Sequence, residues 1–209
     1  MRTLAILPVK SFAQAKQRLS SGLEPPLRRQ LAEVMLYDVL SALSATELDE
    51  VIVVTAGDAA AEIARDQGAR VVVDAEQGHN AAASVGITEA LRSAAERVLL
   101  VPGDCPALDP DEVNQLLDRP AEARSVIIVP DRHGTGTNAL LIRPPDALTP
   151  AFGPGSAQRH ARLAQAAGIA YEVVEVPSLA LDIDTPEDLA TLGRMPDQGL
   201  RTHGLLSRC

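Results

Sequence analysis

The sequence predicts an α/β fold in which helices flank an open, mixed and mostly parallel sheet. Short apolar runs rich in Val, Ile and Leu alternate with segments of helical periodicity along most of the 209 residues. Aromatic residues make up only 2% of a chain that is 46% hydrophobic, so Ala, Val, Leu and Ile must build the core, as suits helices packed on a parallel sheet. The length favours one domain, which we assign to residues 1–193.

The first half of the chain reads as a strand, a long polar loop and a helix, followed by further strand and helix pairs. Apolar side chains between Leu27 and Leu43 recur at helical spacing, Val51 begins a β-branched strand, and Gly68 ends the helix after it. The expected strands are residues 4–9, 51–55, 71–74 and 98–101, and the expected helices are residues 27–43, 59–67 and 80–95.

The second half continues the alternation. Pro102 and Gly103 stop the strand before them, so Asp104 is expected just beyond the carboxyl end of that strand. Thr185 and Pro186 are typical of a helix start, and the residues from 194 to 209 are predicted to form a disordered tail. The expected strands are residues 126–129, 139–142 and 170–176, the first two as a candidate antiparallel pair, and the expected helices are 111–117, 156–167 and the one opened at 185.

Composition excludes several classes of partner. The formal net charge of -9 opposes attraction to nucleic acid or to an anionic membrane surface. No apolar run approaches the roughly 20 residues of a membrane helix, and no signal-peptide pattern follows Met1. Cys105 and Cys209 are far apart and show no metal-type spacing, so we expect reduced thiols in a cytoplasmic protein.

The loop after the first strand carries three cations, Lys10, Lys16 and Arg18, in an otherwise acidic chain. Cationic side chains and backbone N–H groups at that position can bind a triphosphate. The alternative is a basic loop that faces water. The loop has neither the Gly-x-x-x-x-Gly-Lys nor the Gly-x-Gly-x-x-Gly pattern, which argues against a kinase and a dehydrogenase.

Three carboxylates are candidate metal ligands. Asp104 follows a rigid strand, and Asp182 and Asp184 are two residues apart, so an extended backbone puts both on one side. Hard cations such as Mg²⁺ prefer oxygen ligands of this kind. Asp184 or Thr185 can equally cap the helix that follows, and both roles are compatible.

Glycine-rich turns supply further candidates. Gly78 and Asn80 flank a helix start, where Asn80 caps the helix or contacts the sugar or base of a nucleotide. The loops 134–138 and 152–156 carry hydroxyls beside glycines and can cradle a phosphate or carboxylate. Ordinary turn chemistry is the competing explanation for both loops.

Taken together, these motifs resemble one family, the phospholactate and phosphoenolpyruvate guanylyltransferases of coenzyme F-420 biosynthesis. The resemblance covers about residues 1–193, and its most specific part is the glycine-threonine loop followed by the Phe-Gly-x-Gly-Ser loop. The motifs are Leu7-Pro8-Val9-Lys10, Ala15-Lys16-x-Arg18-Leu19, Gly103-Asp104-x-Pro106, Gly134-Thr135-Gly136-Thr137-Asn138, Phe152-Gly153-x-Gly155-Ser156 and Asp182-Ile183-Asp184-Thr185-Pro186.

The resemblance implies a Rossmann-like fold of the nucleotidyltransferase type, with GTP as nucleotide and with Mg²⁺, as two ions, as cofactor. It places the triphosphate on Lys10, Lys16 and Arg18, and it makes Lys16, Arg18 and Asp104 catalytic. Gly78 and Asn80 would complete the nucleotide site, although His79 between them departs from a less polar expectation. The metal ligands would be Asp104, Asp182 and Asp184.

For the acceptor, a small phosphorylated carboxylic acid, the resemblance implies Thr137, Gly153 and Ser156. Arg143, Arg159 or His160 are unranked candidates for added positive charge. The residues alone do not select among phosphoenolpyruvate, 2-phospho-L-lactate and 3-phospho-D-glycerate, because small apolar differences between substrates discriminate weakly. Resemblance to bacterial members favours phosphoenolpyruvate.

Two rival readings and one partner remain open. A nucleotide-sugar glycosyltransferase also carries an Asp-x-Asp motif, but it has no need to grip a departing pyrophosphate. A non-catalytic nucleotide-binding protein would keep the same ligands without turnover. The strands between Val126 and Ile142 are a candidate edge for pairing in a homodimer.

Overall fold

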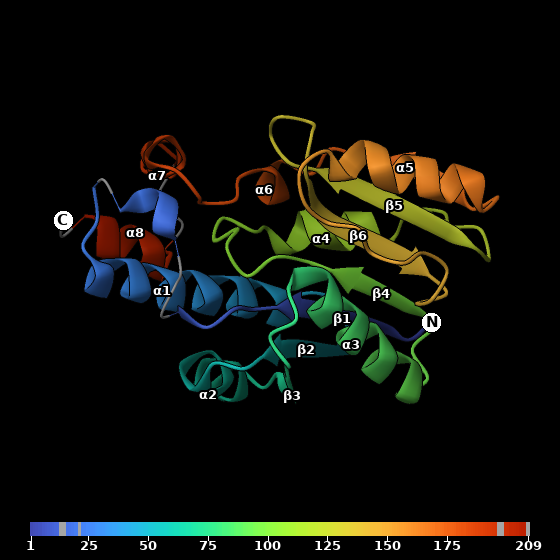
Figure 1. The fold of residues 1–209 in the computed structure, drawn as a ribbon, viewed down its shortest axis with the longest axis horizontal. Helices are drawn as coiled ribbons and strands as arrows, with labels where there is room; N and C mark the ends of the chain where they lie inside the picture. Colours follow the sequence, from blue (N-terminus) through green and yellow to red (C-terminus); the bar gives the residue numbers. More distant parts are fainter. Residues whose placement is uncertain (13–15, 21, 196–198, 208–209) are drawn as a thin grey trace.

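A seven-stranded sheet forms the centre of the part of the chain that is described, with the strand order β3-β2-β1-β4-β6-β5-β7 (Figure 1). The structure is a computed structural model that describes residues 1–12, 16–20, 22–195 and 199–207. The strands are β1 (Thr3–Pro8), β2 (Glu50–Thr55), β3 (Arg70–Val73), β4 (Arg97–Leu100), β5 (Ser125–Pro130), β6 (Thr137–Arg143) and β7 (Ala170–Val173).

Strand directions confirm the mixed, mostly parallel sheet. β1 pairs in parallel with β2 and β4, β2 with β3, and β5 with β7. β6 lies between β4 and β5 and is antiparallel to both, which confirms the expected antiparallel pair. Because β6 and β5 are internal strands, they offer no free edge, so the suggested pairing edge for a second subunit between Val126 and Ile142 is wrong.

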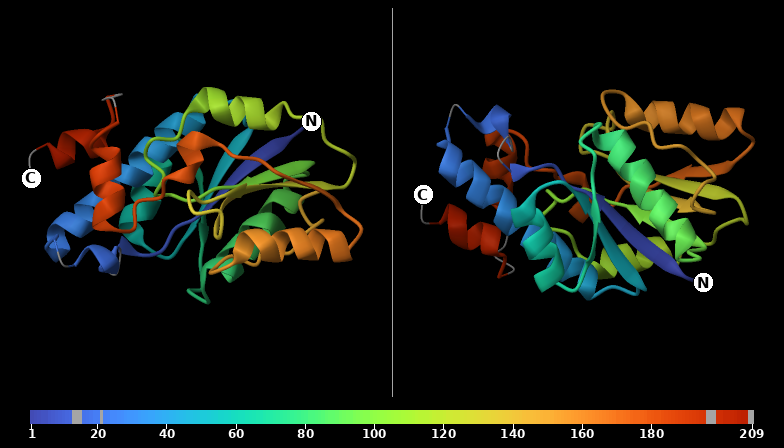
Figure 2. Two further views of the ribbon diagram at one scale, coloured as in Figure 1. Left: turned by 90° about the horizontal axis from the view of Figure 1, so that it is seen from above. Right: turned by 60° about the horizontal axis from the view of Figure 1, so that its bottom comes forward.

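Helices cover both faces of the sheet, and strand side chains alternate between the two cores. Ala5 and Leu7 of β1 pack into the core beneath α1, α2 and α4, whereas Leu4 and Ile6 pack into the core beneath α3 and α5. Figure 2 shows α4 and α5 on opposite sides of the strands. The helices are α1 (Pro25–Ser44), α2 (Asp58–Asp66), α3 (His79–Arg92), α4 (Pro110–Leu117), α5 (Ser156–Ala166), α6 (Pro177–Ala180), α7 (Pro186–Leu192) and α8 (Arg201–Leu206), with a 3₁₀ turn, η2 (Gln17–Leu19), after the first strand.

The contact of α3 with the sheet requires a glycine. A Cβ at Gly86 would lie 2.3 Å from Cγ2 of Ile6 and 3.2 Å from Cγ2 of Val54. The missing side chain therefore lets α3 approach β1 and β2 closely. This approach sets the position of the amino end of α3, which borders the candidate site.

The segment predicted to be a disordered tail includes an ordered helix. α8 packs against α1, where the backbone N–H groups of Arg201 and Thr202 and the Thr202 hydroxyl donate to the buried carboxylate of Asp38. The Arg201 guanidinium also lies 3.1 Å from the centre of the Tyr37 ring. The rest of the predicted tail includes residues 196–198 and 208–209, so the expectation for Cys209 falls outside the described residues.

No helix in the described ranges is long and apolar enough to cross a membrane. Cys105 is buried, and its thiol contacts the Leu179 carbonyl oxygen at 3.5 Å. Burial raises the pKa of the Cys105 thiol well above its usual value, and Asp104 adds to the shift. The expected reduced thiol at this position is therefore an unreactive part of the core.

Candidate functional site

A cavity of about 980 Å³ opens where the first strand and β4 end, at the edge expected from the sequence. Its wall joins three groups of residues that are distant in the chain. The first is the cationic loop, which carries Lys10, Lys16 and Arg18, and the second is the start of α3. The third consists of two carboxylate loops, one with Asp104 after β4 and one with Asp184 before α7. The predicted site residues in the lining are Lys10, Lys16, Arg18, Gly78, Asp104 and Asp184, and His79 lies beside them.

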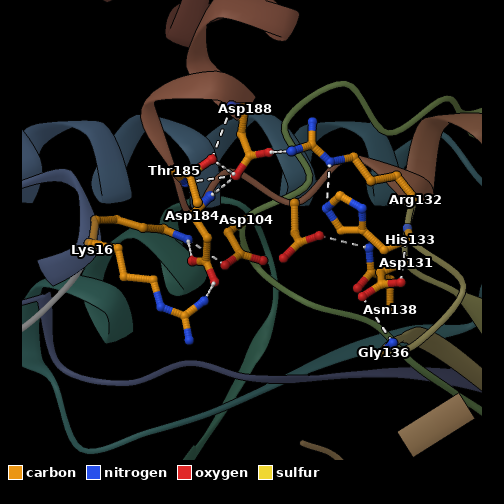
Figure 3. Close-up of polar contacts among 12 residues, drawn as sticks. Lys16, Asp104, Asp131, Arg132, His133, Gly136, Asn138, Asp184, Thr185 and Asp188 are labelled. Carbon is orange, nitrogen blue, oxygen red and sulfur yellow. Dashed lines mark hydrogen bonds and ion pairs between the residues drawn. The ribbon is translucent and has the colours of Figure 1, made fainter. Parts of the chain in front are cut away.

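Lys16 connects two of the predicted carboxylates (Figure 3). Its ammonium lies 2.5 Å from Oδ2 of Asp104 and 3.0 Å from Oδ1 of Asp184, and its side chain is only 8% exposed. Burial lowers the pKa of Lys16, but the two carboxylates outweigh this effect and leave its pKa raised above the usual value. Arg18 is 76% exposed and reaches Asp184 at 3.4 Å, so it can turn toward a ligand.

The two carboxylate loops are tied together through the backbone. The Ile183 N–H donates to the Asp104 carbonyl oxygen at 3.1 Å, which brings the segment before α7 beside the end of β4. Thr185 caps α7 in a capping box with Asp188. The helix-cap interpretation of this segment is therefore confirmed for Thr185, while the carboxylate of Asp184 stays available to Lys16.

Asp188 holds the same loop through hydrogen bonds to its backbone and an ion pair. Its carboxylate accepts from the N–H groups of Asp184 and Thr185 at 3.0 and 2.7 Å and pairs with Arg132 at 2.5 Å (Figure 3). Burial alone would raise the pKa of Asp188, but these hydrogen bonds and the Arg132 charge lower it overall. The ion pair of Asp188 with Arg132 joins residues 56 positions apart, so it has no local signal in the sequence.

Asp182 points to a different partner. Its Oδ1 accepts from Nδ2 of Asn138 at 3.2 Å, and the same amide donates to the Leu179 carbonyl oxygen at 2.7 Å. Burial, followed by the charge of Asp104, raises the pKa of Asp182. Asn138 was part of a recognised motif, but its role in holding Asp182 had no local sequence signal.

The carboxylates have the chemistry of metal ligands, but three of them are not grouped around one point. Asp104 and Asp184 already share one cation, and their hard oxygen donors suit Mg²⁺ or Mn²⁺. Among the described residues, no three His, Cys, Asp or Glu side chains are grouped so that they could hold one ion. The three-carboxylate set of Asp104, Asp182 and Asp184 therefore stays a prediction.

Asn80 joins the start of α3 to the loop after β6. Its Oδ1 accepts from the Phe152 N–H at 2.7 Å, and its Nδ2 donates to the Phe152 carbonyl oxygen at 3.2 Å. The structure shows no side-chain cap on α3, whose N-cap residue is Gly78 at φ 101°. The cap that spacing favours for Asn80 is therefore replaced by a contact between residues 72 positions apart.

Thr137, Gly153 and Ser156 come together around the start of α5. The Ser156 N–H donates to the Gly153 carbonyl oxygen at 3.0 Å, and Thr137 Oγ1 lies 3.0 Å from Nδ1 of His160. The Ser156 side chain is buried, and its Oγ has no hydrogen-bond partner among the described residues. A buried hydroxyl without a partner costs stability.

The loop before Thr137 is shaped by Asp131. Its carboxylate accepts from the N–H groups of Thr135 and Gly136 at 3.0 and 2.9 Å. A Cβ at Gly136 would lie 2.5 Å from Oδ2 of Asp131, so only glycine allows this turn. The turn presents Thr137 at the first position of β6.

None of the three candidates for added charge near the acceptor supplies a free cation there. Arg143 ends β6, about 20 Å along the strand from Thr137, and donates to the Ala121 carbonyl oxygen. Arg159 donates to the carbonyl oxygens of Ala151 and Pro154, both at 2.7 Å, and so braces the loop. Burial and then the charge of Arg159 lower the pKa of His160 to about 4, so it is neutral at pH 7.

Several solved structures have the same fold. A nucleotidyl transferase from Methanothermobacter covers 100% of this chain and 99% of its own at 21% identity, with a TM-score of 0.65. A Mycobacterium tuberculosis protein solved in complex with manganese covers 92% and 98% at 18% identity, with a TM-score of 0.55. The chain therefore has the fold of a nucleotidyl transferase.

Sequence comparison then gives the family. Residues 3–203 match the family described as guanylyl transferase CofC like, and the chain belongs to this family. The phosphoenolpyruvate guanylyltransferase of Conexibacter woesei is 50% identical over 92% of this chain and 87% of its own length. The 2-phospho-L-lactate guanylyltransferase of Methanothermobacter thermautotrophicus is 36% identical over 92% and 84%, and the 3-phospho-D-glycerate guanylyltransferase of Colwellia psychrerythraea is 35% identical over 92% and 91%.

Proposed function

We propose that this protein transfers the guanylyl group of GTP to the phosphate of phosphoenolpyruvate. The products are pyrophosphate and enolpyruvoyl-2-diphospho-5'-guanosine, an intermediate of coenzyme F-420 biosynthesis in the cytoplasm. The observation that carries the proposal is the cavity in which Lys10, Lys16 and Arg18 face Asp104 and Asp184. The relative that is 50% identical over the aligned residues supports phosphoenolpyruvate as the acceptor.

The same reaction on 2-phospho-L-lactate or 3-phospho-D-glycerate is the second candidate. Two relatives over a third identical carry those acids in their names. The three acids share a carboxylate and a phosphate, so one set of donors can bind all of them. We assign that set to the Thr137 hydroxyl, the Gly153 backbone and the buried Ser156 hydroxyl.

In this proposal the triphosphate lies along the cationic loop. Lys10, Lys16 and Arg18 contact its oxygens, and the start of α3 at Gly78 contacts the nucleoside. Asn80 acts indirectly, since its amide holds the Phe152 backbone. Lys16 leaves its carboxylate partners when the triphosphate offers a stronger anionic contact.

Asp104 and Asp184, with Asp182 nearby, are the residues that would hold Mg²⁺, which we propose binds as two ions. Bound Mg²⁺ supplies positive charge against the phosphate oxygens during transfer. The Lys16 ammonium, which lines the cavity, can bind the departing pyrophosphate. Arg18, being exposed, can contact the same group.

The transfer needs no general base from the protein. A phosphate monoester has a second pKa near 6, so its oxygen is already anionic at neutral pH. That oxygen forms a bond to the α-phosphorus while the bond from the α-phosphorus to the bridging oxygen breaks, and pyrophosphate leaves with the electron pair.

The experiment that tests the proposal measures pyrophosphate release. Purified protein is mixed with GTP and Mg²⁺ and with each of the three acids in parallel, with GTP alone and ATP plus each acid as controls. We expect release with GTP and phosphoenolpyruvate and none with GTP alone. Release with another acid instead would identify the second candidate as correct.

The rival classes give different results in the same assay. A glycosyltransferase would release no pyrophosphate from GTP with any of the acids. A non-catalytic binding protein would bind GTP without turnover, as measured by calorimetry. Either result would overturn the proposed reaction while leaving the fold unchanged.

A further inference from the structure

His160 is a buried imidazole whose two ring nitrogens both have partners. The residue is 0% exposed and lies on the second turn of α5. Its Nε2 lies 2.9 Å from the backbone nitrogen of Ala151, and its Nδ1 lies 3.0 Å from Oγ1 of Thr137. Phe152 packs against the ring edge to face, with 5.3 Å between the ring centres.

These partners determine where the proton of the imidazole lies. The backbone N–H of Ala151 can only donate, so Nε2 must accept and carries no proton. A neutral imidazole then has its single proton on Nδ1, which donates to Oγ1 of Thr137. A second proton on Nε2 would set two donors against each other, so the protonated ring does not fit this position.

The direction of this hydrogen bond also orients Thr137. A threonine hydroxyl has one proton, and its oxygen can accept while the proton is donated elsewhere. With Nδ1–H donating to the oxygen, the hydroxyl proton of Thr137 turns to another acceptor. The phosphate and carboxylate of the proposed acid substrate are acceptors only, so an oriented donor suits them.

His160 also fixes the loop that carries Gly153. The Ala151 N–H is bonded to its ring, and the Ala151 carbonyl oxygen is bonded to Arg159, one residue earlier on α5. On the other side, Asn80 holds the Phe152 backbone. The loop is therefore clamped from α5 and from α3 immediately before Gly153.

We propose that His160 is a positioning residue for the acid substrate: it turns the Thr137 hydroxyl into a hydrogen-bond donor and holds the backbone before Gly153. The proposal rests on the proposed function, because it assigns Thr137 and Gly153 to the acceptor. His160 itself contacts neither substrate. Its effect therefore falls on binding of the acid and leaves the GTP site unchanged.

A double-mutant cycle tests the coupling of the two side chains. His160→Phe removes both ring nitrogens at similar size, and Thr137→Val removes the hydroxyl. We expect each to raise KM for the acid at least about tenfold, as a lost hydrogen bond to a charged group does, with KM for GTP changed less than about twofold. The double variant is expected to be no worse than the poorer single variant. Effects that multiply in the double variant, or equal increases in both KM values, would overturn the proposal.

Conservative variants provide the matched controls. Thr137→Ser keeps the hydroxyl and His160→Asn keeps a donor at the position of Nδ1, so both are expected to recover most of the acid affinity. Thermal unfolding of every variant shows whether a change in KM comes from loss of structure. If His160→Phe does not fold, KM for the acid is compared between Thr137→Val and Thr137→Ser and measured for His160→Asn, and these values still test the proposal.

A spectroscopic readout is independent of turnover. The sequence has four histidines, and the signals of His160 are assigned as those lost in His160→Asn. Nitrogen-15 NMR at pH 7 is expected to show a protonated Nδ1 and a bare Nε2 for this ring. The opposite tautomer, or a doubly protonated ring, would overturn the proposed orientation of Thr137.

The two levels of failure are distinguishable. If wild-type protein releases pyrophosphate with none of the three acids, the proposed function fails and the positioning role falls with it. If the wild type is active but His160→Phe leaves KM for the acid unchanged, only the positioning role fails.

Discussion

Lys16 shows at the scale of one residue how charge shapes the site. Its φ of 54° is in the left-handed region, directly before η2, and its ammonium reaches carboxylates that follow it by 88 and 168 positions. Asp104 and Asp184 repel each other unless a cation lies between them. The single lysine therefore neutralises part of this repulsion and keeps both carboxylates at the cavity.

Replacing Lys16 should separate chemistry from folding. Lys16→Met keeps the length of the side chain and removes its charge. We expect kcat to fall about 10²-fold or more, because a contact to the developing charge of the leaving group is lost. Steady-state pyrophosphate release measures this, with Arg29→Met on the exposed face of α1 as control. A normal kcat for Lys16→Met would show that Lys16 takes no part in the reaction.

Loss of either carboxylate that contacts Lys16 should stop the reaction. Asp104→Ala is expected to abolish turnover without unfolding the protein, and Asp184→Asn to do the same. Asp66→Asn, at the exposed end of α2, is the matched control and should keep full activity. Near-normal turnover of Asp104→Ala at saturating Mg²⁺ would contradict the metal-ligand prediction. The measurements are pyrophosphate release and circular dichroism.

His160 predicts a pH dependence of stability. Its folded pKa of about 4 lies below the value of about 6.5 expected in the unfolded chain. Between these values the unfolded chain binds a proton that the folded protein does not, so the free energy of unfolding should fall as the pH falls from 6.5 to 4. Urea denaturation across this range is expected to show a shallower decline for His160→Asn than for wild type. Parallel curves would contradict the low pKa.

At the scale of elements, the strands and their order along the chain were predictable because hydrophobic alternation and turn residues are local signals. Asp104 at the end of β4 followed from Pro102 and Gly103 in the same way. The hydrogen bonds between the Asn80 side chain and the Phe152 backbone were not predictable, since the two residues are 72 positions apart and local spacing favours a helix cap. Arg143 lies at the far end of β6 because the strand runs seven residues from Thr137, a length that the shorter expected strand did not show.

The close approach of α3 to the sheet gives a prediction about Gly86. Gly86→Ala should lower the free energy of unfolding by about 1–3 kcal/mol through overpacking, although alanine favours the helix by about 1 kcal/mol. The clash is with Cγ2 of Ile6, so the effect should shrink in an Ile6→Ala background. Chemical denaturation of the four proteins measures both effects. An equal loss in both backgrounds would mean that Ile6 is not the obstacle.

At the scale of the whole molecule, α8 is an integral part of the fold. Asp38 of α1 is only 5% exposed, and its carboxylate is satisfied by the first residues of α8. Sequence reasoning assigned residues 194–209 to a disordered tail because a helix of six residues has no periodicity to detect. Its order depends on a partner 163 positions earlier in the chain.

Removing α8 should therefore destabilise the enzyme. A chain ending at residue 198 loses the three hydrogen bonds to the Asp38 carboxylate and the packing of α8 on α1. We expect a clear drop in the melting temperature of the shortened chain. Calorimetry provides the measurement, with Arg201→Ala as a milder change in the full chain. An unchanged melting temperature would mean that α8 contributes nothing to stability.

The placement of β6 between β4 and β5 also dictates an order of events during synthesis. β5 is connected to β4 and the strands beyond it only through β6, yet it leaves the ribosome before β6, and all six of its residues are buried in the folded protein. Until the turn shaped by Asp131 closes, a nascent chain exposes this apolar strand. Closing of the glycine-rich turn that presents Thr137 is therefore a step that shortens the time during which the nascent chain exposes an aggregation-prone strand.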